Sequence, residues 1–278
     1  MELTVRHQTT YHYETPASQV ALLLRLQPTL LDSQTPHPWE VTVNGVPVQN
    51  FKPNALGDGE AFFRLRSAVD EVVIVASGAV ATRDQHGVIS GFGQEVPLPV
   101  FLRQTHLTRP DGALVALAHA TEGADHLSRL HALSALVRGE VSYLAGATST
   151  ASTAAEALAQ GQGVCQDHAH VFVSVARFLG IPARYVVGYL MAQEGGQALR
   201  ETHAWAEAWV DGLGWIGFDS TNGLCVTDHY VRLCCGLDAH DAAPVRGSVL
   251  GATAITIRAD VMIGEATPDA AQQTQQQQ

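Results

Sequence analysis

The stretch GQGVCQDHAHVF, residues 161 to 172, decides how this chain folds because it places a cysteine at the start of a helix. Two glycines let the backbone turn tightly and leave open space in front of Cys165. From Cys165 onward, apolar residues recur at three- and four-residue spacings as far as Leu179. Gly180 followed by Pro182 then stops the pattern. The sequence therefore predicts a buried helix that begins at Cys165.

A cysteine in this position can be a nucleophile. The free N–H groups and the positive end of the helix dipole favour the thiolate form, and the same N–H groups can bind an oxyanion. The alternative is an ordinary buried cysteine that packs as a small hydrophobic side chain. A nucleophilic cysteine also needs a base within hydrogen-bond reach and a third group that orients the base. Such partners are therefore sought elsewhere in the chain.

His203 is the candidate base, and Asp219 is the candidate orienting group. Strict alternation in THAWAEAWV places His203 on the same strand face as Trp205, and GWIGFD, which ends at Asp219, follows after the turn residues DGLG. A two-residue loop would turn Asp219 away from His203, whereas an odd-length loop or a bulge puts both on one face. We predict the odd loop. The alternatives are a strand-edge histidine satisfied by backbone and an aspartate that caps a loop.

Residues 1 to 105 read as short alternating runs separated by turn signals, which is typical of an antiparallel β domain. The runs are LTVRHQTTYHY, VALLLRLQP, WEVTVNGVPV, AFFRLR and DEVVIVASGAV. The Gly- and Pro-rich segment GFGQEVPLPVFL then breaks the period, and we place a domain boundary near residue 105. The length of 278 residues also favours two domains, because single domains typically have about 100 to 200 residues.

Helices precede strands in the second part of the chain. A helical pattern begins at Asp125, and another short helix is predicted from Thr153 to Gln160. Strand-like runs follow the cysteine helix, and ATAITIRADVMI resembles a closing strand. We therefore expect an α+β protein with a β domain over residues 1–105, a core over 106–268, and a disordered Gln-rich tail over 269–278.

Composition limits the classes of partner. Hydrophobic residues make up 46% of the chain and charged residues 15%, as in a packed globular protein. The formal charge of −11 argues against a nucleic-acid or anionic-membrane partner. The start of the chain lacks the pattern of a secretion signal, and no apolar run reaches about 18 residues, so a cytoplasmic location is expected. In a reducing cytosol the four cysteines are expected to be thiols.

Other polar residues receive weaker interpretations. Cys165 with His168 and His170 could suggest a metal site, but the spacing on a helix is poor and no second ligand pair follows, so helix capping and core hydrogen bonding are the favoured roles. Tyr143 could add its hydroxyl to an oxyanion hole, although core packing is the favoured interpretation. No glycine-rich stretch has a phosphate-binding pattern, and no metal or other cofactor is expected.

Taken in order, GVCQDHAH, GIPARYVVGYL, HAWAEAWV, GWIGFDSTNG and APVRG resemble the core of bacterial transglutaminase-like proteins. The N-terminal RHQTTYHYETP with LLLRLQP is similar to the β domain that commonly precedes it, so the resemblance covers nearly the whole chain. It implies a papain-like core in which Cys165 attacks a carbonyl group, His203 transfers protons and Asp219 orients the histidine. Ser220 departs from the family pattern, which usually has proline after the aspartate.

The expected function is cysteine-dependent acyl transfer on peptide or amide bonds, with a peptide or protein as substrate. Water as acceptor would make the protein a peptidase or amidase, and an amine would make it a transglutaminase. Hydrolysis is the favoured outcome, because many relatives outside the animal cross-linking enzymes are hydrolytic. Two other classes stay open, a non-catalytic scaffold and a metal-dependent hydrolase. The sequence does not indicate an oligomeric state.

Overall fold

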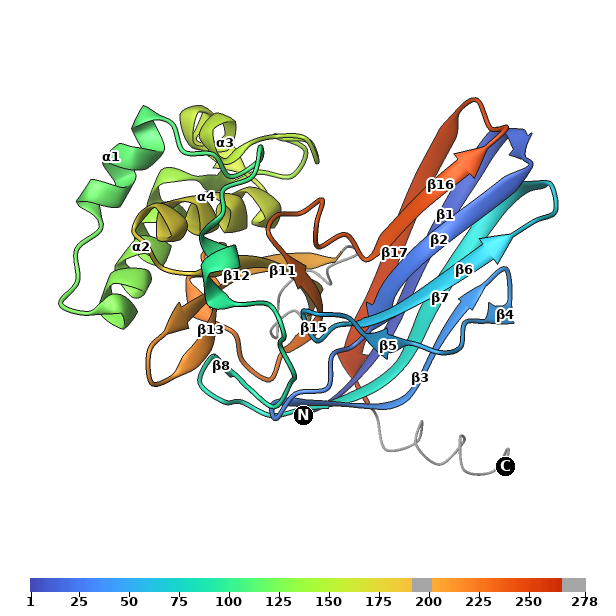
Figure 1. Ribbon diagram of the computed structural model, residues 1–278, viewed down its shortest axis with the longest axis horizontal. Helices are drawn as coiled ribbons and strands as arrows, with labels where there is room; N and C mark the ends of the chain where they lie inside the picture. Colours follow the sequence, from blue (N-terminus) through green and yellow to red (C-terminus); the bar gives the residue numbers. More distant parts are fainter. Residues whose placement is uncertain (192–201, 267–278) are drawn as a thin grey trace.

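A computed structural model describes residues 1–191 and 202–266. It is an α+β structure in which a part made only of strands lies beside a part where helices cover a curled antiparallel sheet (Figure 1). The expected fold class is thereby confirmed. The predicted tail, residues 269–278, lies outside the described residues. Within the described ranges, no helix is long and apolar enough to cross a membrane.

Two antiparallel sheets build the strand-only part. The first has the order β17-β1-β7-β3-β4, and the second has the order β16-β2-β6-β5. Their strands are β1 (Glu2–Ala17), β2 (Gln19–Gln27), β3 (Gln34–Val43), β4 (Val46–Pro47), β5 (Lys52–Pro53), β6 (Gly59–Leu65), β7 (Val69–Thr82), β16 (Val245–Leu250) and β17 (Ile255–Glu265). Alternate residues such as Leu3 and Val5 of β1, and Val20 and Leu22 of β2, are buried in a shared apolar core.

The last two strands that the structure describes, β16 and β17, belong to these N-terminal sheets. β17 pairs antiparallel with β1 from Leu3↔Glu265 to Tyr13↔Ile255, and β16 pairs with β2. The sequence indicated a strand near residues 252–263 but assigned it to the second domain. A pairing between the two ends of the chain cannot be read from local periodicity, because alternation shows only that a segment is extended.

The six-stranded sheet of the second part has the order β14-β13-β12-β11-β15, with β8 paired to β13. Its strands are β8 (Val88–Ile89), β11 (Ala183–Leu190), β12 (His203–Val210), β13 (Gly214–Asp219), β14 (Leu224–Cys225) and β15 (Tyr230–Gly236). The helices are η1 (Leu98–Leu102), α1 (Gly112–Ala120), α2 (His126–Glu140), α3 (Ala154–Gln160) and α4 (Cys165–Phe178), and β9 (Ser142–Tyr143) pairs with β10 (Gln162–Gly163).

Helix α4 is the central helix and begins at Cys165, as predicted. Its first turn is capped by Asp167, whose Oδ2 accepts the Val164 N–H at 2.7 Å. Residues such as Phe172 and Val175 are completely buried against Ala206 and Ala208 of β12. Helix α1 was not anticipated, because GALVALAHA is apolar on nearly every side and therefore shows no clear helical period.

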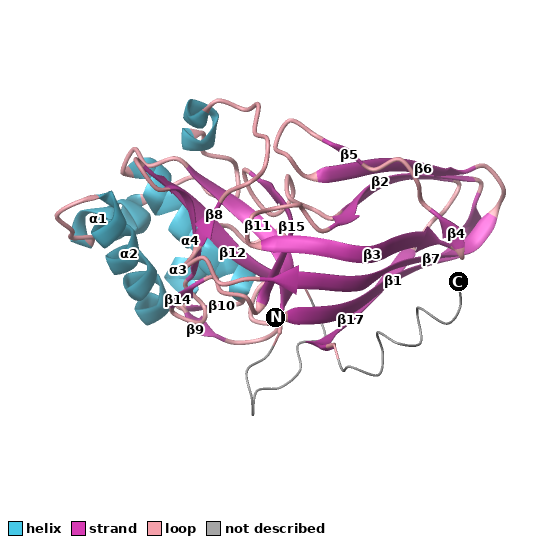
Figure 2. Cartoon of the chain, turned by 90° about the horizontal axis from the view of Figure 1, so that it is seen from below, coloured by secondary structure: helices cyan, strands magenta, loops and turns pink. Residues whose placement is uncertain are grey.

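The other face of the six-stranded sheet is covered by segments from the first 102 residues. An apolar cluster on this face joins Leu31, Ile89 and Phe101 to Trp205 and Trp215. The Gly- and Pro-rich segment that contains Phe92 and Phe101 therefore packs on the sheet. The helices α1, α2, α3 and α4 lie at the end of the molecule away from the strand-only part (Figure 2). The sheet thus lies between α4 and the N-terminal segments, so side chains on both of its faces are buried.

Candidate active site

Cys165 is half-buried at the first residue of α4. Gly163, two residues before it, must be a glycine because a Cβ there would lie 2.7 Å from the Cβ of Asp167. This close approach lets the Asp167 carboxylate reach back to the Val164 N–H and fix the start of the helix. The thiol is thereby held at the helix N-terminus, at the positive end of the helix dipole.

His203 begins β12 and Asp219 ends β13, so the hairpin brings them to the same end of the sheet. The pair Val210↔Gly214 leaves a three-residue loop, 211–213, which confirms the predicted odd length. His203 and Asp219 consequently lie on one face, and His203 Nε2 is 2.7 Å from Asp219 Oδ2. The Cys165 side chain lies close enough to His203 to raise the pKa of its imidazole, so the structure brings the three predicted residues together.

Asp219 is fully buried and accepts four further hydrogen bonds. The donors are Thr221 N and Asn222 N to Oδ1, at 3.0 and 3.2 Å, and Asn222 Nδ2 and Tyr230 Oη to Oδ2, at 2.7 and 2.6 Å. The sequence did not single out Tyr230 or Asn222. Tyr230 stands at the start of β15, which pairs with β11 and not with β13, so only the sheet order shows that it reaches Asp219.

The site stabilises a charged imidazolium. Burial would lower the pKa of His203, but hydrogen bonds to Asp219 and Cys165 and their negative charges raise that pKa to about 10. Burial would raise the pKa of Asp219, but its hydrogen bonds and the charge of His203 hold the pKa below the usual value. Trp205 stacks beside His203 at a centroid distance of 6.3 Å, and Tyr230 lies at 6.1 Å. These rings limit contact between His203 and water.

The raised pKa of His203 predicts a pH-dependent contribution to stability. The folded protein holds this proton more tightly than the unfolded chain, whose histidine pKa is 6.5. The stabilisation is fully present below pH 6.5 and is lost as the pH rises to about 10. We expect the wild type to exceed His203→Gln in melting temperature by a margin that shrinks across this range. Melting curves of both proteins check this, and a constant margin would contradict it.

The polar residues that follow Cys165 have structural contacts. His168 places Nδ1 2.9 Å from the Val164 carbonyl oxygen and Nε2 2.7 Å from that of Val141. His170 Nε2 accepts the Ala239 N–H at 3.1 Å. These are the helix-capping and core contacts that the sequence favoured over metal binding. Among the described residues, no group of three or more His, Cys, Asp or Glu side chains could hold a metal ion.

Tyr143 does not pack in the core, so the favoured interpretation of this residue was wrong. Its side chain is 56% exposed. It lies near the nucleophile helix because β9 pairs in parallel with β10, which sets Tyr143 opposite Gly163. Cys234 and Cys235 are buried on β15, and burial raises the pKa of Cys234 above its usual range and that of Cys235 to about 12.

Comparison with known families agrees with this architecture. Residues 3–81 match the bacterial transglutaminase-like N-terminal region, and residues 115–220 match the transglutaminase-like superfamily. The second match includes Cys165, His203 and Asp219. The uncharacterized protein ML0607 of Mycobacterium leprae is 28% identical over 279 residues, which cover 93% of this chain and 98% of that protein.

Two further comparisons concern part of the chain and its fold. The uncharacterized protein Rv2569c of Mycobacterium tuberculosis is 31% identical over 129 residues, covering 43% of this chain and 41% of that protein. The crystal structure of a candidate cysteine protease from Cytophaga hutchinsonii superimposes with a TM-score of 0.69 at 22% identity. That match covers 96% of this chain and 93% of the other, so the two proteins share their fold over nearly their whole length.

Proposed function

Because the chain belongs to the transglutaminase-like superfamily and carries the bacterial transglutaminase-like N-terminal region, we propose that it is a cysteine-dependent acyl-transfer enzyme that hydrolyses peptide or amide bonds. One observation carries the proposal: His203 is hydrogen-bonded to buried Asp219 and also lies close enough to Cys165, at a helix N-terminus, for the cysteine to raise the pKa of the imidazole. A cysteine with only a packing role would not need a buried base and a carboxylate with five donors.

In the proposed reaction, the Cys165 thiolate forms a C–S bond to the substrate carbonyl carbon, and the carbonyl electron pair moves to oxygen. The Cys165 N–H at the start of α4 is available to stabilise that oxyanion. When the intermediate collapses, the C–N bond breaks and the amine leaves with a proton from His203. Asp219 holds the imidazole in the orientation and charge state that this transfer requires.

The thioester is then resolved by water. His203 takes a proton from the water, the hydroxyl oxygen bonds to the acyl carbon, and the C–S bond breaks to restore the thiolate. A primary amine that attacked in place of water would give a transamidated product from the same thioester. Peptides or proteins are the proposed substrates, and the acidic chain, with 27 acidic against 16 basic residues, would favour basic ones.

Alkylation of Cys165 by iodoacetamide tests the proposal. We expect fast labelling at Cys165 that persists below neutral pH, because the imidazolium of His203 stabilises the thiolate. In His203→Ala, labelling at pH 6 should fall about tenfold or more. Alkylation requires the thiolate, and an upward shift of the labelling profile by one pH unit lowers the thiolate population about tenfold on the acid side. Mass spectrometry locates the label, and half-buried Cys225 serves as the internal reference.

The opposite result has a clear meaning. Labelling of Cys165 at the rate of an ordinary thiol, unchanged by His203→Ala, would make this cysteine structural and favour the non-catalytic scaffold. If Cys165 is activated, incubation with a peptide library with and without a primary amine then separates hydrolysis from transamidation, because only the second adds the mass of the amine to the acyl product.

A further inference from the structure

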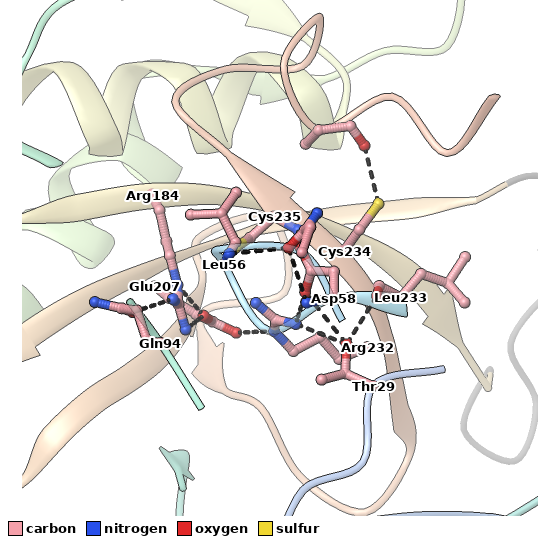
Figure 3. Close-up of polar contacts among 12 residues, drawn as sticks. Thr29, Leu56, Asp58, Gln94, Arg184, Glu207, Arg232, Leu233, Cys234 and Cys235 are labelled. Carbon is pink, nitrogen blue, oxygen red and sulfur yellow. Dashed lines mark hydrogen bonds and ion pairs between the residues drawn. The ribbon is translucent and has the colours of Figure 1, made fainter. Parts of the chain in front are cut away.

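Four charged side chains form a buried chain on the face of the six-stranded sheet that points away from α4 (Figure 3). Arg184 Nε donates to Glu207 Oε2 at 2.6 Å, and Arg232 Nε donates to Glu207 Oε1 at 2.9 Å. Arg232 Nη1 lies 2.6 Å from Asp58 Oδ1. Each of the four residues is at most 2% exposed. We call these residues the charge chain.

The charge chain needs a residue from the N-terminal part of the molecule. Arg184, Glu207 and Arg232 belong to β11, β12 and β15 and together carry one net positive charge. Asp58, which directly precedes β6, supplies the negative charge that makes the set neutral. An uncompensated charge in a buried site is strongly unfavourable, so the core sheet by itself would contain an unbalanced arginine.

Asp58 is fixed from several directions. Its Oδ2 accepts the Cys235 N–H at 2.9 Å, and Thr29 Oγ1 lies 3.3 Å from its Oδ1. The same Thr29 Oγ1 accepts a hydrogen bond from Arg232 Nη1 at 2.9 Å. Gln34 adds a pair of hydrogen bonds to the backbone of Arg232, at 2.7 and 2.8 Å. Residues of the N-terminal part therefore hold β15 through both the side chain and the backbone of Arg232.

The strands of the charge chain also carry the candidate active site. Tyr230, which donates to Asp219, is two residues from Arg232 on the same face of β15. His203 is four residues from Glu207 on the same face of β12. Trp205 lies between the two groups, stacked beside His203 and edge-on to Tyr230 at 5.5 Å. A shift of Arg232 along β15 would therefore move Tyr230 relative to Asp219.

We propose that Asp58 is a positioning residue for the reaction, which acts through Arg232 and Tyr230 to hold Asp219 and His203 in place. The N-terminal region is then a required part of the active-site architecture and not a separable appendage. The inference rests on the proposed function, because it concerns the geometry of the same three residues.

The direction of the effect follows from the contacts of His203. Among the residues that the structure describes, the charged and titratable groups that face it are Cys165 from α4, Asp219 from β13 and Tyr230 from β15. Loss of the Asp58 charge leaves Arg232 to share the single carboxylate of Glu207 with Arg184, and we expect it to weaken the Tyr230–Asp219 contact. Both the unbalanced positive charge and a misplaced Asp219 disfavour the imidazolium. Cys165 then loses the imidazolium beside it, and its alkylation on the acid side becomes slower.

The test is the pH profile of Cys165 alkylation by iodoacetamide in the full-length wild type and in Asp58→Asn. We expect the profile of the variant to shift upward by about one pH unit, which lowers labelling about tenfold on the acid side. In an Arg232→Gln background, Asp58→Asn should add no further shift, because Asp58 acts through that arginine. Asp70→Asn, the same change at an exposed residue of β7, should match the wild type.

The outcomes separate this inference from the proposed function. A wild type that labels like an ordinary thiol overturns the proposed function, and the positioning role with it. A wild type with activated Cys165 and a folded Asp58→Asn with the same profile overturns the positioning role alone. If Asp58→Asn does not fold, Thr29→Val removes one acceptor of Arg232 Nη1 and the hydroxyl donor to Asp58 Oδ1, with little change of shape. An unchanged profile in folded Thr29→Val likewise overturns the role.

Discussion

The Asp219→Asn protein is expected to release p-nitrophenolate from p-nitrophenyl acetate, an activated ester that reports acylation of a nucleophile, about 10³- to 10⁴-fold more slowly than the wild type. Asp219 accepts from five donors. An amide offers one oxygen, so its NH₂ group must face donors on one side. Either His203 loses its acceptor or the turn at Thr221 and Asn222 is disrupted.

Asp219→Asn mainly destabilises the imidazolium form of His203. Its pKa is raised by the hydrogen bond and charge of Asp219, and asparagine removes the charge. The matched control is Asp211→Asn on the same hairpin, where the carboxylate accepts from Trp209 Nε1 at 3.0 Å and an amide oxygen can replace the carboxylate oxygen. We expect wild-type rates from this control. Activity in Asp219→Asn within tenfold of the wild type would contradict the proposed role of Asp219.

Glu207→Gln is expected to destabilise the folded protein by about 3–5 kcal/mol, the cost of breaking a buried ion pair by removing one partner. In the wild type, Glu207 lies between Arg184 and Arg232 and accepts hydrogen bonds from both guanidinium groups. Its negative charge offsets the cost of burying the two arginines. Burial would raise the pKa of Glu207, but the two arginines hold that pKa below its usual value. Glutamine keeps the volume and removes the charge, which leaves two buried cations against Asp58.

Denaturant unfolding measures the effect as a loss of free energy of unfolding. A loss of this size is a large fraction of the stability of a typical protein, which is about 5–15 kcal/mol, so a substantial unfolded population is expected on mild heating. Glu122→Gln, the same change at an exposed position, should stay within about 0.5 kcal/mol of the wild type. An unfolding midpoint for Glu207→Gln equal to the wild-type value would show that the charge chain contributes nothing to stability.

Local sequence signals were informative wherever a single segment carried them. The helix that begins at Cys165 follows from its apolar spacing and its glycine and proline stops, and α4 has that start. The turn residues at 211–214 and the alternation of the flanking strands predicted the register in which His203 and Asp219 share a face. Helix α1 lacked such a signal, because apolar residues on every side of a segment do not define a period.

Exposure of single side chains was harder to predict. Tyr143 was expected in the core because aromatic residues usually bury much of their surface, yet 56% of it is exposed. Its place is decided by the two-residue parallel pairing of β9 with β10, which sets it opposite Gly163. A pairing this short has no recognisable pattern in the sequence, so the position of Tyr143 near the cysteine was visible only in the structure.

The sequence by itself determined the class of fold, the helix that presents Cys165 and the hairpin that joins His203 to Asp219, because each depends on residues close together in the chain. Only the tertiary structure showed which residues contact and position these groups. Tyr230 reaches Asp219, Asp58 balances Arg232, and β17 pairs with β1, each across a sheet order that brings distant segments together. Periodicity reports which residues are buried but not what they face, so the partners of buried charges appear only when the chain is folded.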